Sequence, residues 1–291
     1  MKSLPFGFFS SASAARLRPI FAALGFAAVC AGPLRAQSPV FTEDFESGQL
    51  DPAVWDTRTS GNVQITVQQV LVAHGKSALQ IHYPKGGTRS YGFVVATHLP
   101  DEVRTHCFGR AYVYISAGMP AGHDVLLNAG TSGYPTSNFL EIGASGGKNV
   151  MLSYQQNGAG VPRGETLTRG SPYPVGRWFC LEWEFTDHPD RTTVWIDGVP
   201  AGELADFTVT PGKPTMLPPG GAAAAAAKPA PVAPAASAGA PPEPAIPGTD
   251  LVKGFVDFSF GFRAWGRGAK EDFDLYYDDI AIATKRIGPV N

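Results

Sequence analysis

The chain has 291 residues, of which 44% are hydrophobic, and its formal net charge is −2. This length suffices for one large domain, and its 23 Lys and Arg residues are outnumbered by 25 Asp and Glu residues. Because nucleic-acid binding requires an excess of clustered basic residues, this composition argues against a nucleic-acid partner.

The first 36 residues have the features of an export signal. They contain an apolar run over residues 20–29 and end at Ala36, a small residue suited to a cleavage site. They also contain basic residues but no acidic residue: Lys2, Arg16, Arg18 and Arg35. These features are typical of a signal peptide, and the run is shorter than the roughly 20 residues that span a bilayer. A membrane anchor and a lipoprotein linked through Cys30 are the alternatives.

Cleavage after Ala36 predicts an acidic, monomeric protein that is secreted or periplasmic and has no membrane contact. Two cysteines remain after cleavage, Cys107 and Cys180. An oxidising compartment permits a disulfide between them, but the sequence does not give their separation, so the pairing stays open. A metal site at these cysteines is not expected, because no Cys-x-x-Cys motif or neighbouring His completes a zinc set.

Beyond Ala36, short alternating runs are separated by Gly, Pro, Asn and Asp, which is the pattern of antiparallel strands. Residues 106–115 have one polar and aromatic face, formed by Arg110, Tyr112 and Tyr114. Their other face is apolar and consists of Ala111, Val113 and Ile115. Residues 178–185 likewise separate an apolar face from a polar one, with the apolar set Phe179, Leu181, Trp183 and Phe185 and the polar set Cys180, Glu182 and Glu184.

Asp197-Gly198 predicts a tight hairpin turn, because both positions favour a positive φ. Residues 211–249 are rich in Ala, Pro and Gly and have few large apolar residues, so we expect a flexible surface insertion. A linker between domains is disfavoured, since only about 40 residues follow it, too few for an independent core. The next strand has an apolar face of Phe258, Phe260, Phe262 and Ala264, opposite Asp257, Ser259, Arg263 and Trp265. No long amphipathic helix is evident, so two packed antiparallel sheets are expected.

Three segments carry a resemblance to a known family: residues 41–48 with Trp55, residues 72–79, and residues 273–284. Together they resemble the concanavalin A-like jelly rolls of secreted carbohydrate-active proteins. More closely, the chain looks like the fungal cellulose-induced secreted protein and the glucuronan lyases of polysaccharide lyase family 20. The resemblance covers most of residues 40–288 apart from the insertion. It implies an all-β jelly-roll sandwich of two antiparallel sheets that handles a polysaccharide, whereas the fold alone does not fix the function.

The resemblance also implies a structural calcium ion that joins the two ends of the chain. Glu46 matches the family's N-terminal carboxylate ligand, and Asp278 matches its C-terminal one. The loop from His74 to Ser77 matches a loop that supplies oxygen ligands, although it is one residue shorter here. Calcium prefers six to eight oxygen ligands, which two carboxylates and a tight turn could supply. The alternative is that Glu46 and Asp278 are solvated charges at strand ends.

A lyase of this kind would cleave a uronic-acid glycan by β-elimination, which needs a group that neutralises the carboxylate, a base and an acid. We assign Arg110 as the neutralising group and Tyr154 as the base or acid. The expected substrate-binding residues are Tyr112, Tyr114, Glu141, Gln156, Arg263 and Trp265. His123 stands just before a strand and is a further candidate for the cleft.

The resemblance weakens at one informative strand. The family carries a His and an Arg where this chain has Phe139 and Glu141, and a carboxylate there would repel a uronate. Glu141 could instead act as a glycosidase carboxylate with Asp257, which would require a separation of roughly 5–10 Å. Two functions therefore remain open: a polysaccharide lyase, or a non-catalytic carbohydrate-binding or envelope structural module.

Overall fold

A computed structural model describes residues 38–290 except 87–88, 97, 131–138, 157–163, 188–189, 206–253 and 266–267. Within residues 206–253 it also gives three strands of two residues each. The described residues belong to one compact unit. The predicted signal peptide, residues 1–36, lies outside the described residues, as does nearly all of the predicted insertion, residues 211–249.

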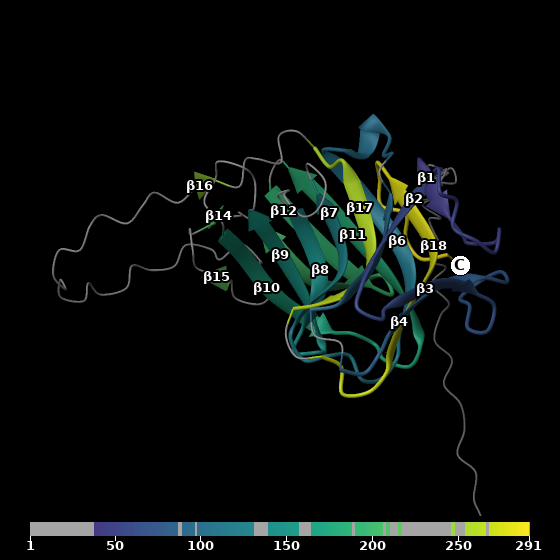
Figure 1. The fold of residues 1–291 in the computed structure, drawn as a ribbon. Coiled ribbons are helices and arrows are strands. Elements are labelled where there is room, and N and C mark those ends of the chain that lie inside the picture. The colour runs from purple at the N-terminus through teal and green to yellow at the C-terminus, as the bar shows by residue number, and fades with distance from the viewer. Residues whose placement is uncertain are drawn as a thin grey trace, which may run out of the picture. The chain divides into compact units, whose positions relative to one another are not determined.

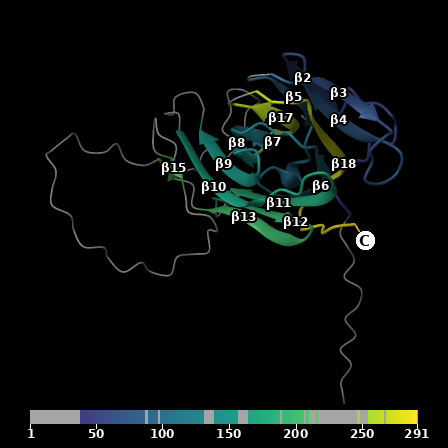
Figure 2. The same ribbon diagram turned by 90° about the horizontal axis from the view of Figure 1, so that it is seen from below.

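Two sheets of eight strands each form the core of this unit, and Figure 2 shows them as two layers. Sheet A has the order β13-β12-β11-β6-β18-β4-β3, with β1 beside β18. Its strands are β1 (Phe41–Glu43), β3 (Gln64–Gln68), β4 (Ala78–Tyr83), β6 (His106–Ile115), β11 (Trp178–Asp187), β12 (Asp190–Ile196), β13 (Val199–Ala205) and β18 (Phe273–Ala283).

Sheet B has the order β15-β10-β9-β8-β7-β17-β5-β2 (Figure 1). Its strands are β2 (Trp55–Ser60), β5 (Tyr91–Ala96), β7 (His123–Gly130), β8 (Phe139–Ser145), β9 (Asn149–Gln156), β10 (Gly164–Pro172), β15 (Thr215–Met216) and β17 (Asp257–Ala264). Strands β14 (Thr208–Val209) and β16 (Ile246–Pro247) form a separate pair. Both large sheets are antiparallel except where β10 and β15 pair in parallel.

The described part of the chain is almost free of helix, as expected for a sandwich. Its one helical element is a 3-10 turn, η1 (Asp101–Val103). Within that part, no helix has the length and apolar character needed to cross a membrane. The alternation of buried and exposed residues that predicts antiparallel strands is therefore realised as two sheets packed face to face.

The predicted strand faces are confirmed. Ala111, Val113 and Ile115 lie in the core, as do the apolar sets of β11 and β17. Trp183 packs against Phe260 across the sheets with ring centroids 5.9 Å apart. Gly109 lies beneath Trp183, and a Cβ atom there would collide with the indole ring. The predicted hairpin is also present, with φ of 50° at Asp197 and 78° at Gly198.

The two cysteines do not form a disulfide. Cys107 faces the core and is opposite Phe185, whereas Cys180 is opposite Tyr112 and belongs to the polar outer face of sheet A. Because successive residues of a strand point to opposite faces, the two thiols lie on different sides of sheet A. Burial raises the pKa of Cys180 to about 12, so neither position offers a reactive thiolate.

Asp124 carries a buried carboxylate at one end of sheet B. It is opposite Ala264 of β17 and Ala144 of β8, both core residues, so its side chain lies on the core side. Both carboxylate oxygens lack a hydrogen-bond partner among the described residues. Desolvation raises the pKa of Asp124 to about 7, although the adjacent His123 lowers it in part.

We predict that Asp124→Asn stabilises the protein at alkaline pH. The folded-state pKa lies above the unfolded value of 3.8, so the folded form binds the proton more tightly. Stability is thus fully present below about pH 4 and falls by roughly 4 kcal/mol as pH rises through 7. Denaturant unfolding should show equal stability of variant and wild type at pH 4 and a more stable variant at pH 8. The exposed Asp101→Asn control should show no such divergence, and parallel pH curves for Asp124→Asn would contradict the prediction.

Candidate functional site

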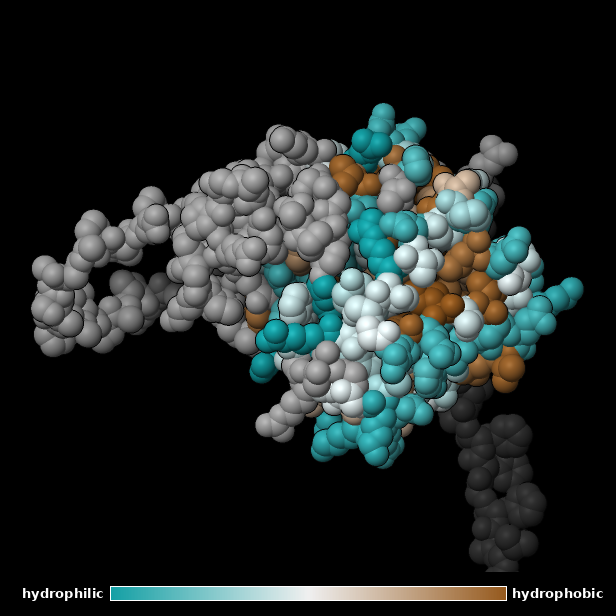
Figure 3. Space-filling model, in the orientation of Figure 1, coloured by the Kyte–Doolittle hydropathy of each residue, from teal (hydrophilic) through white to brown (hydrophobic). Residues whose placement is uncertain are grey.

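The outer face of sheet B carries aligned rows of side chains. The strand register places one row across six strands, formed by Tyr91, Arg263, Val125, Gly143, Met151 and Arg169. A neighbouring row is largely polar and consists of Val95, Ser259, Asn128, Glu141, Ser153 and Leu167. Hydrophilic residues spread over the described surface in Figure 3, and its hydrophobic residues gather mainly on the right, away from β8, β9 and β10.

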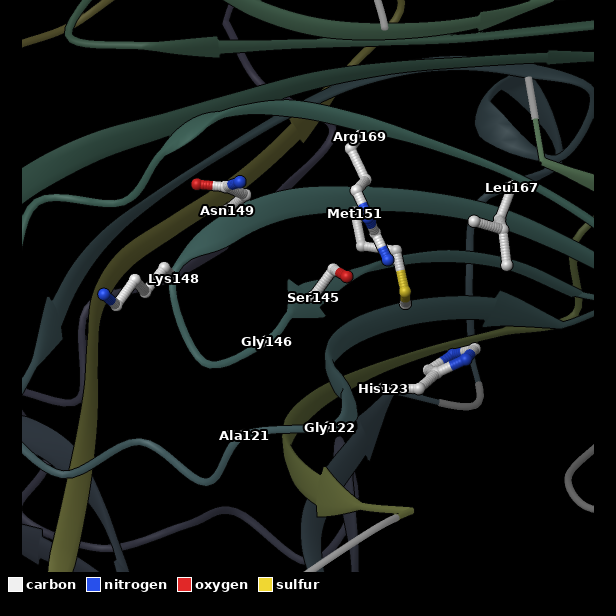
Figure 4. Close-up of a pocket in the computed structure, with 10 residues that line it drawn as sticks. All are labelled: Ala121, Gly122, His123, Ser145, Gly146, Lys148, Asn149, Met151, Leu167 and Arg169. Carbon is white, nitrogen blue, oxygen red and sulfur yellow. The ribbon is translucent and has the colours of Figure 1, made fainter. Parts of the chain in front are cut away.

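A cavity of about 520 Å³ opens at the ends of β7, β8, β9 and β10. The described residues that line it include three basic side chains and no acidic one: His123, Lys148 and Arg169. In Figure 4, Arg169 and Met151 point toward the middle of the cavity, while His123 and Lys148 border it on opposite sides. Lys148 follows the turn at Gly146 and Gly147, whose φ values are 64° and 69°. The wall is therefore suited to a negatively charged group.

His123 and Glu141 form a pair at the edge of this cavity. Their Nε2 and Oε2 atoms lie 3.2 Å apart, and the Glu141 carboxylate is 2% exposed. The same oxygen accepts hydrogen bonds from Ser153 Oγ at 3.2 Å and Gln155 Nε2 at 2.7 Å. These donors satisfy the buried carboxylate, and the carboxylate in turn orients the imidazole ring.

An aromatic and cationic stack lies beside the cavity. The Arg263 guanidinium carbon is 4.9 Å from the Tyr91 ring centroid and 4.3 Å from that of Trp265. Desolvation lowers the pKa of Arg263 to about 10, although Tyr91 raises it in part. The backbone N–H of Trp265 donates to the His123 carbonyl at 3.1 Å, which places the stack next to the cavity. Trp265 is 44% exposed, so its ring is available to a ligand.

Tyr154 does not reach the outer face of sheet B, so its assignment as base or acid is wrong. It pairs with Leu140, lies in the core and is fully buried. Its neighbours Ser153 and Gln155 point outward instead, because alternate residues of β9 occupy opposite faces. Gln156 ends β9 in the next register position, and its side chain lies outside the described part.

Arg110, Tyr112 and Tyr114 lie on the outer face of sheet A, not with Glu141 on sheet B. Arg110 Nη1 donates to the carbonyl of Gly288 at 3.3 Å, and the Tyr112 hydroxyl bonds the backbone of Val290. Arg110 and Tyr112 thus hold the C-terminal segment, and Arg110, which was assigned as the neutralising group, lies on a different face from that of Glu141 and does not meet Tyr154.

Glu182, which lies opposite Arg110 in the neighbouring strand, pairs with Arg286 instead of Arg110. Arg286 binds Glu182 through two hydrogen bonds of 3.1 Å and 2.8 Å and stacks on Trp195 at 4.1 Å. The backbone N–H of Gly288 also donates to Glu182 at 3.0 Å. This network fastens the C-terminal segment over the middle of sheet A.

Glu141 and Asp257 lie on the same outer face of sheet B, two strands and two residues apart. Strand spacing and rise put their Cα atoms about 12 Å apart. Glu141 is 2% and Asp257 is 3% exposed, and burial raises the pKa of Asp257. Neither carboxylate is presented to a sugar in this arrangement, which disfavours the glycosidase pair. Phe139 lies on the same face, opposite Gly130.

The residues that the family resemblance assigns to calcium meet at the loop of residues 73–77. Glu46 Oε1 accepts hydrogen bonds from the N–H groups of Lys76 at 2.7 Å and Ser77 at 2.9 Å, which lowers its pKa. Asp278 Oδ2 accepts from Ala73 at 2.9 Å and His74 at 3.1 Å. Burial nevertheless raises the pKa of Asp278 to about 6. The two ends of the chain are therefore joined through this loop.

The donor set at this junction is chemically compatible with calcium. Two carboxylates reach one short loop, and buried Asp278 lies beside the like charge of Asp279, which also raises its pKa. Among the described residues, no group of three or more His, Cys, Asp or Glu is placed to hold a metal. A bound ion would therefore need backbone oxygens of the loop in addition to Glu46 and Asp278.

Sequence reasoning missed the basic residues of the cavity. His123 was expected only as a further candidate, and Lys148 and Arg169 were not expected at all. The Gly146-Gly147 pair was an available signal, because it predicts a hairpin turn that places Lys148 just before the first residue of β9. Arg169 carries no comparable signal, since its position depends on the pairing of β10 with β9.

No protein-family model matches this sequence, and no curated protein matches it. Solved structures with a similar fold include the cellulose-induced protein Cip1, with a TM-score of 0.54 and 16% identity over 86% of this chain and 100% of that chain. They also include an endo-β-1,4-glucuronan lyase from the fungus Trichoderma reesei, with a TM-score of 0.54 and 15% identity over 85% of this chain and 96% of that chain. The chain therefore has the concanavalin A-like jelly-roll fold of these two proteins.

Proposed function

We propose that this chain binds an acidic polysaccharide across the outer face of sheet B, with a carboxylate of the glycan in the cavity. The observation that carries this proposal is the cavity wall formed by Arg169, Lys148 and His123, without an acidic residue among its described lining. The fold shared with a glucuronan lyase supports it. Polysaccharides of this kind lie outside the cell, which agrees with the predicted export signal of residues 1–36.

Glu141 does not oppose this function as strongly as the sequence suggests. A free carboxylate at this position would repel a uronate, but Ser153, Gln155 and His123 surround it. Its charge is therefore held within a local hydrogen-bond network, while Arg169 is exposed at the cavity. A uronate would meet the basic groups before it meets Glu141.

Trp265 supplies the apolar part of the proposed site. Arg263 stacks on the Trp265 ring and is itself stacked on Tyr91, and the backbone of Trp265 contacts that of His123. A sugar ring can lie against an exposed indole while its charged neighbour occupies the cavity. The arrangement thus suits a chain of at least two sugar units rather than a single small molecule.

We predict that Arg169→Ala weakens the binding of β-1,4-glucuronan roughly tenfold, because a cation that contacts the carboxylate is lost. Calorimetry at low and high salt should show the loss and a weaker salt dependence in the variant. The matched control is Arg177→Ala, an exposed arginine paired with Asp197 away from the cavity, which should bind like wild type. Equal affinities for wild type and Arg169→Ala would contradict the proposed carboxylate site.

The His123–Glu141 pair favours a second candidate function, β-elimination of the same glycan. In this reaction a base removes the proton beside the carboxylate, a double bond forms, and the bond to the leaving sugar oxygen breaks as that oxygen gains a proton. Arg169 or Lys148 would neutralise the substrate carboxylate, and His123, oriented by Glu141, would take the proton and then return it to the leaving oxygen. This assignment replaces Arg110 and Tyr154 with residues that line one cavity.

If the chain is a lyase, His123→Ala should lower the rate of formation of unsaturated product, seen by ultraviolet absorbance, by at least about 100-fold. The control His106→Ala removes a comparable His–Glu pair, with Glu184, on sheet A and should keep full activity. An unchanged rate in His123→Ala would exclude this base. If the chain binds uronans but forms no unsaturated product from any uronan of a panel, the lyase function is excluded and only the binding function remains.

We propose further that calcium binds at the junction of Glu46, Asp278 and the loop from His74 to Ser77. Burial and the like charge of Asp279 raise the pKa of Asp278. The positive charge of the ion would offset both effects and stabilise the ionised carboxylate. The ion would link the N-terminal and C-terminal strands more tightly than the backbone hydrogen bonds do alone.

We predict that calcium at about a hundredfold excess over its Kd raises the Tm by about 5–10 °C, and that a chelator reverses the shift. Glu46→Gln and Asp278→Asn should abolish the response. Glu184→Gln, on the outer face of sheet A away from the loop, should leave it intact. A wild-type Tm that responds to neither calcium nor chelator would contradict this proposal.

A further inference from the structure

The outer face of sheet A carries a cluster of three aromatic residues that the proposed function does not use. Trp178 of β11 is opposite Tyr114 of β6, and Tyr114 is opposite Tyr276 of β18. The three residues, here called the aromatic triad, therefore lie side by side across three adjacent strands. Each is partly exposed, and the triad belongs to the sheet opposite the cavity.

The rings of the triad fix one another in place. Tyr114 and Trp178 have centroids 5.8 Å apart at 62°, and Tyr114 and Tyr276 have centroids 5.7 Å apart at 86°. Trp178 and Tyr276 are 6.3 Å apart at 64°. Such edge-to-face contacts favour a defined orientation of each ring. A ligand that binds here would therefore lose little side-chain entropy from the protein.

A polar border adjoins the triad on β4 and β18. Gln80 Nε2 donates to Asp274 Oδ1 at 2.9 Å and to the Tyr276 hydroxyl at 3.1 Å. His82 Nδ1 lies 3.0 Å from the same Asp274 oxygen. The side chains of His82 and Asp274 are 32% and 26% exposed, so these planar groups are open to solvent.

The border keeps hydrogen-bonding capacity beyond its internal contacts. The Tyr276 hydroxyl accepts a hydrogen bond from Gln80 and can still donate its own proton, while Asp274 Oδ2 can still accept one. His82 engages Asp274 through Nδ1, which leaves Nε2 directed elsewhere. Donors and acceptors beside aromatic rings suit hydroxyl groups, because a sugar hydroxyl both donates and accepts.

We propose that the aromatic triad and its polar border bind a neutral polysaccharide, as a second carbohydrate site on sheet A. Sugar rings with equatorial hydroxyls, as in β-1,4-linked glucans and xylans, present apolar C–H faces that can pack against aromatic rings. Their hydroxyls can reach Asp274, His82 and Tyr276 at the border. An acidic glycan is disfavoured, because Asp274 would repel its carboxylate and the border offers no Lys or Arg.

This site is independent of the proposed acidic-glycan site. The two lie on the outer faces of opposite sheets, with the core between them. One chain could therefore hold a neutral glycan through sheet A and an acidic glycan through sheet B, with a gain in avidity where the two glycans are parts of one material.

Affinity gel electrophoresis with hydroxyethylcellulose and with neutral arabinoxylan tests the proposal. We expect wild type to be retarded by at least one of these glycans, and Trp178→Ala to lose roughly tenfold in affinity. Tyr276→Phe removes the hydroxyl, and Asp274→Asn replaces the carboxylate by a neutral amide, while both keep the aromatic rings of the triad. Each should weaken binding severalfold. The control Trp195→Ala removes a tryptophan of the same face that is covered by Arg286, and it should bind like wild type.

The outcomes separate this proposal from the acidic-glycan site. Arg169→Ala should leave retardation by neutral glycans unchanged, and Trp178→Ala should leave β-1,4-glucuronan binding unchanged. Circular dichroism and Tm measurements identify any variant that fails to fold, and Asp274→Asn then carries the test. Absence of retardation of wild type by both neutral glycans would overturn the proposal. Full retardation of Trp178→Ala, Tyr276→Phe and Asp274→Asn would overturn it as well.

Discussion

The packing of two inner sheet faces against each other is the constraint on which every other feature depends. Trp183 and Phe185 of sheet A meet Phe260 and Phe258 of sheet B, and the largest fully buried side chains of the described residues are all aromatic. Each fully buried side chain of this size contributes roughly 1.5–3 kcal/mol. Because the core takes every second residue of a strand, only the alternate residues can face a ligand.

This alternation explains what could be predicted from the sequence and what could not. Period two separates Tyr112 from Val113 correctly, and it predicts the core faces of β6, β11 and β17. A sandwich has two outer faces, however, and periodicity does not say on which of them a polar residue lies. Arg110 was therefore grouped with Glu141, although they belong to opposite sheets. Tyr154 was assigned to the outer face of sheet B, but that face is formed by its neighbours Ser153 and Gln155. A shift of one residue along a strand moves a side chain from the outer face to the core.

The contacts that build the candidate site depend on strand pairing. Glu141 meets His123 because β7 and β8 are adjacent, and Arg169 joins them only because β10 pairs with β9. A short sequence motif cannot indicate these contacts, because they join residues that lie far apart in the sequence. The junction of Glu46 and Asp278 was anticipated for a different reason: it lies at the two chain ends, where the family resemblance is clearest. Their common contact with residues 73–77 follows from β1 and β4 both pairing with β18.

The same core gives the two outer faces different chemistry without conflict. Sheet B presents basic groups around a cavity, and three neighbouring side chains compensate the buried carboxylate of Glu141 on its outer face. Sheet A covers its central carboxylate, Glu182, with Arg286 of the C-terminal segment and leaves aromatic residues exposed beyond it. Such partners stabilise a buried carboxylate in its charged form, whereas Asp124, which lacks them, has a raised pKa. Each compensated charge thus restricts which ligand its surface accepts. The basic cavity therefore favours an acidic glycan, and the charge-compensated aromatic face favours a neutral one.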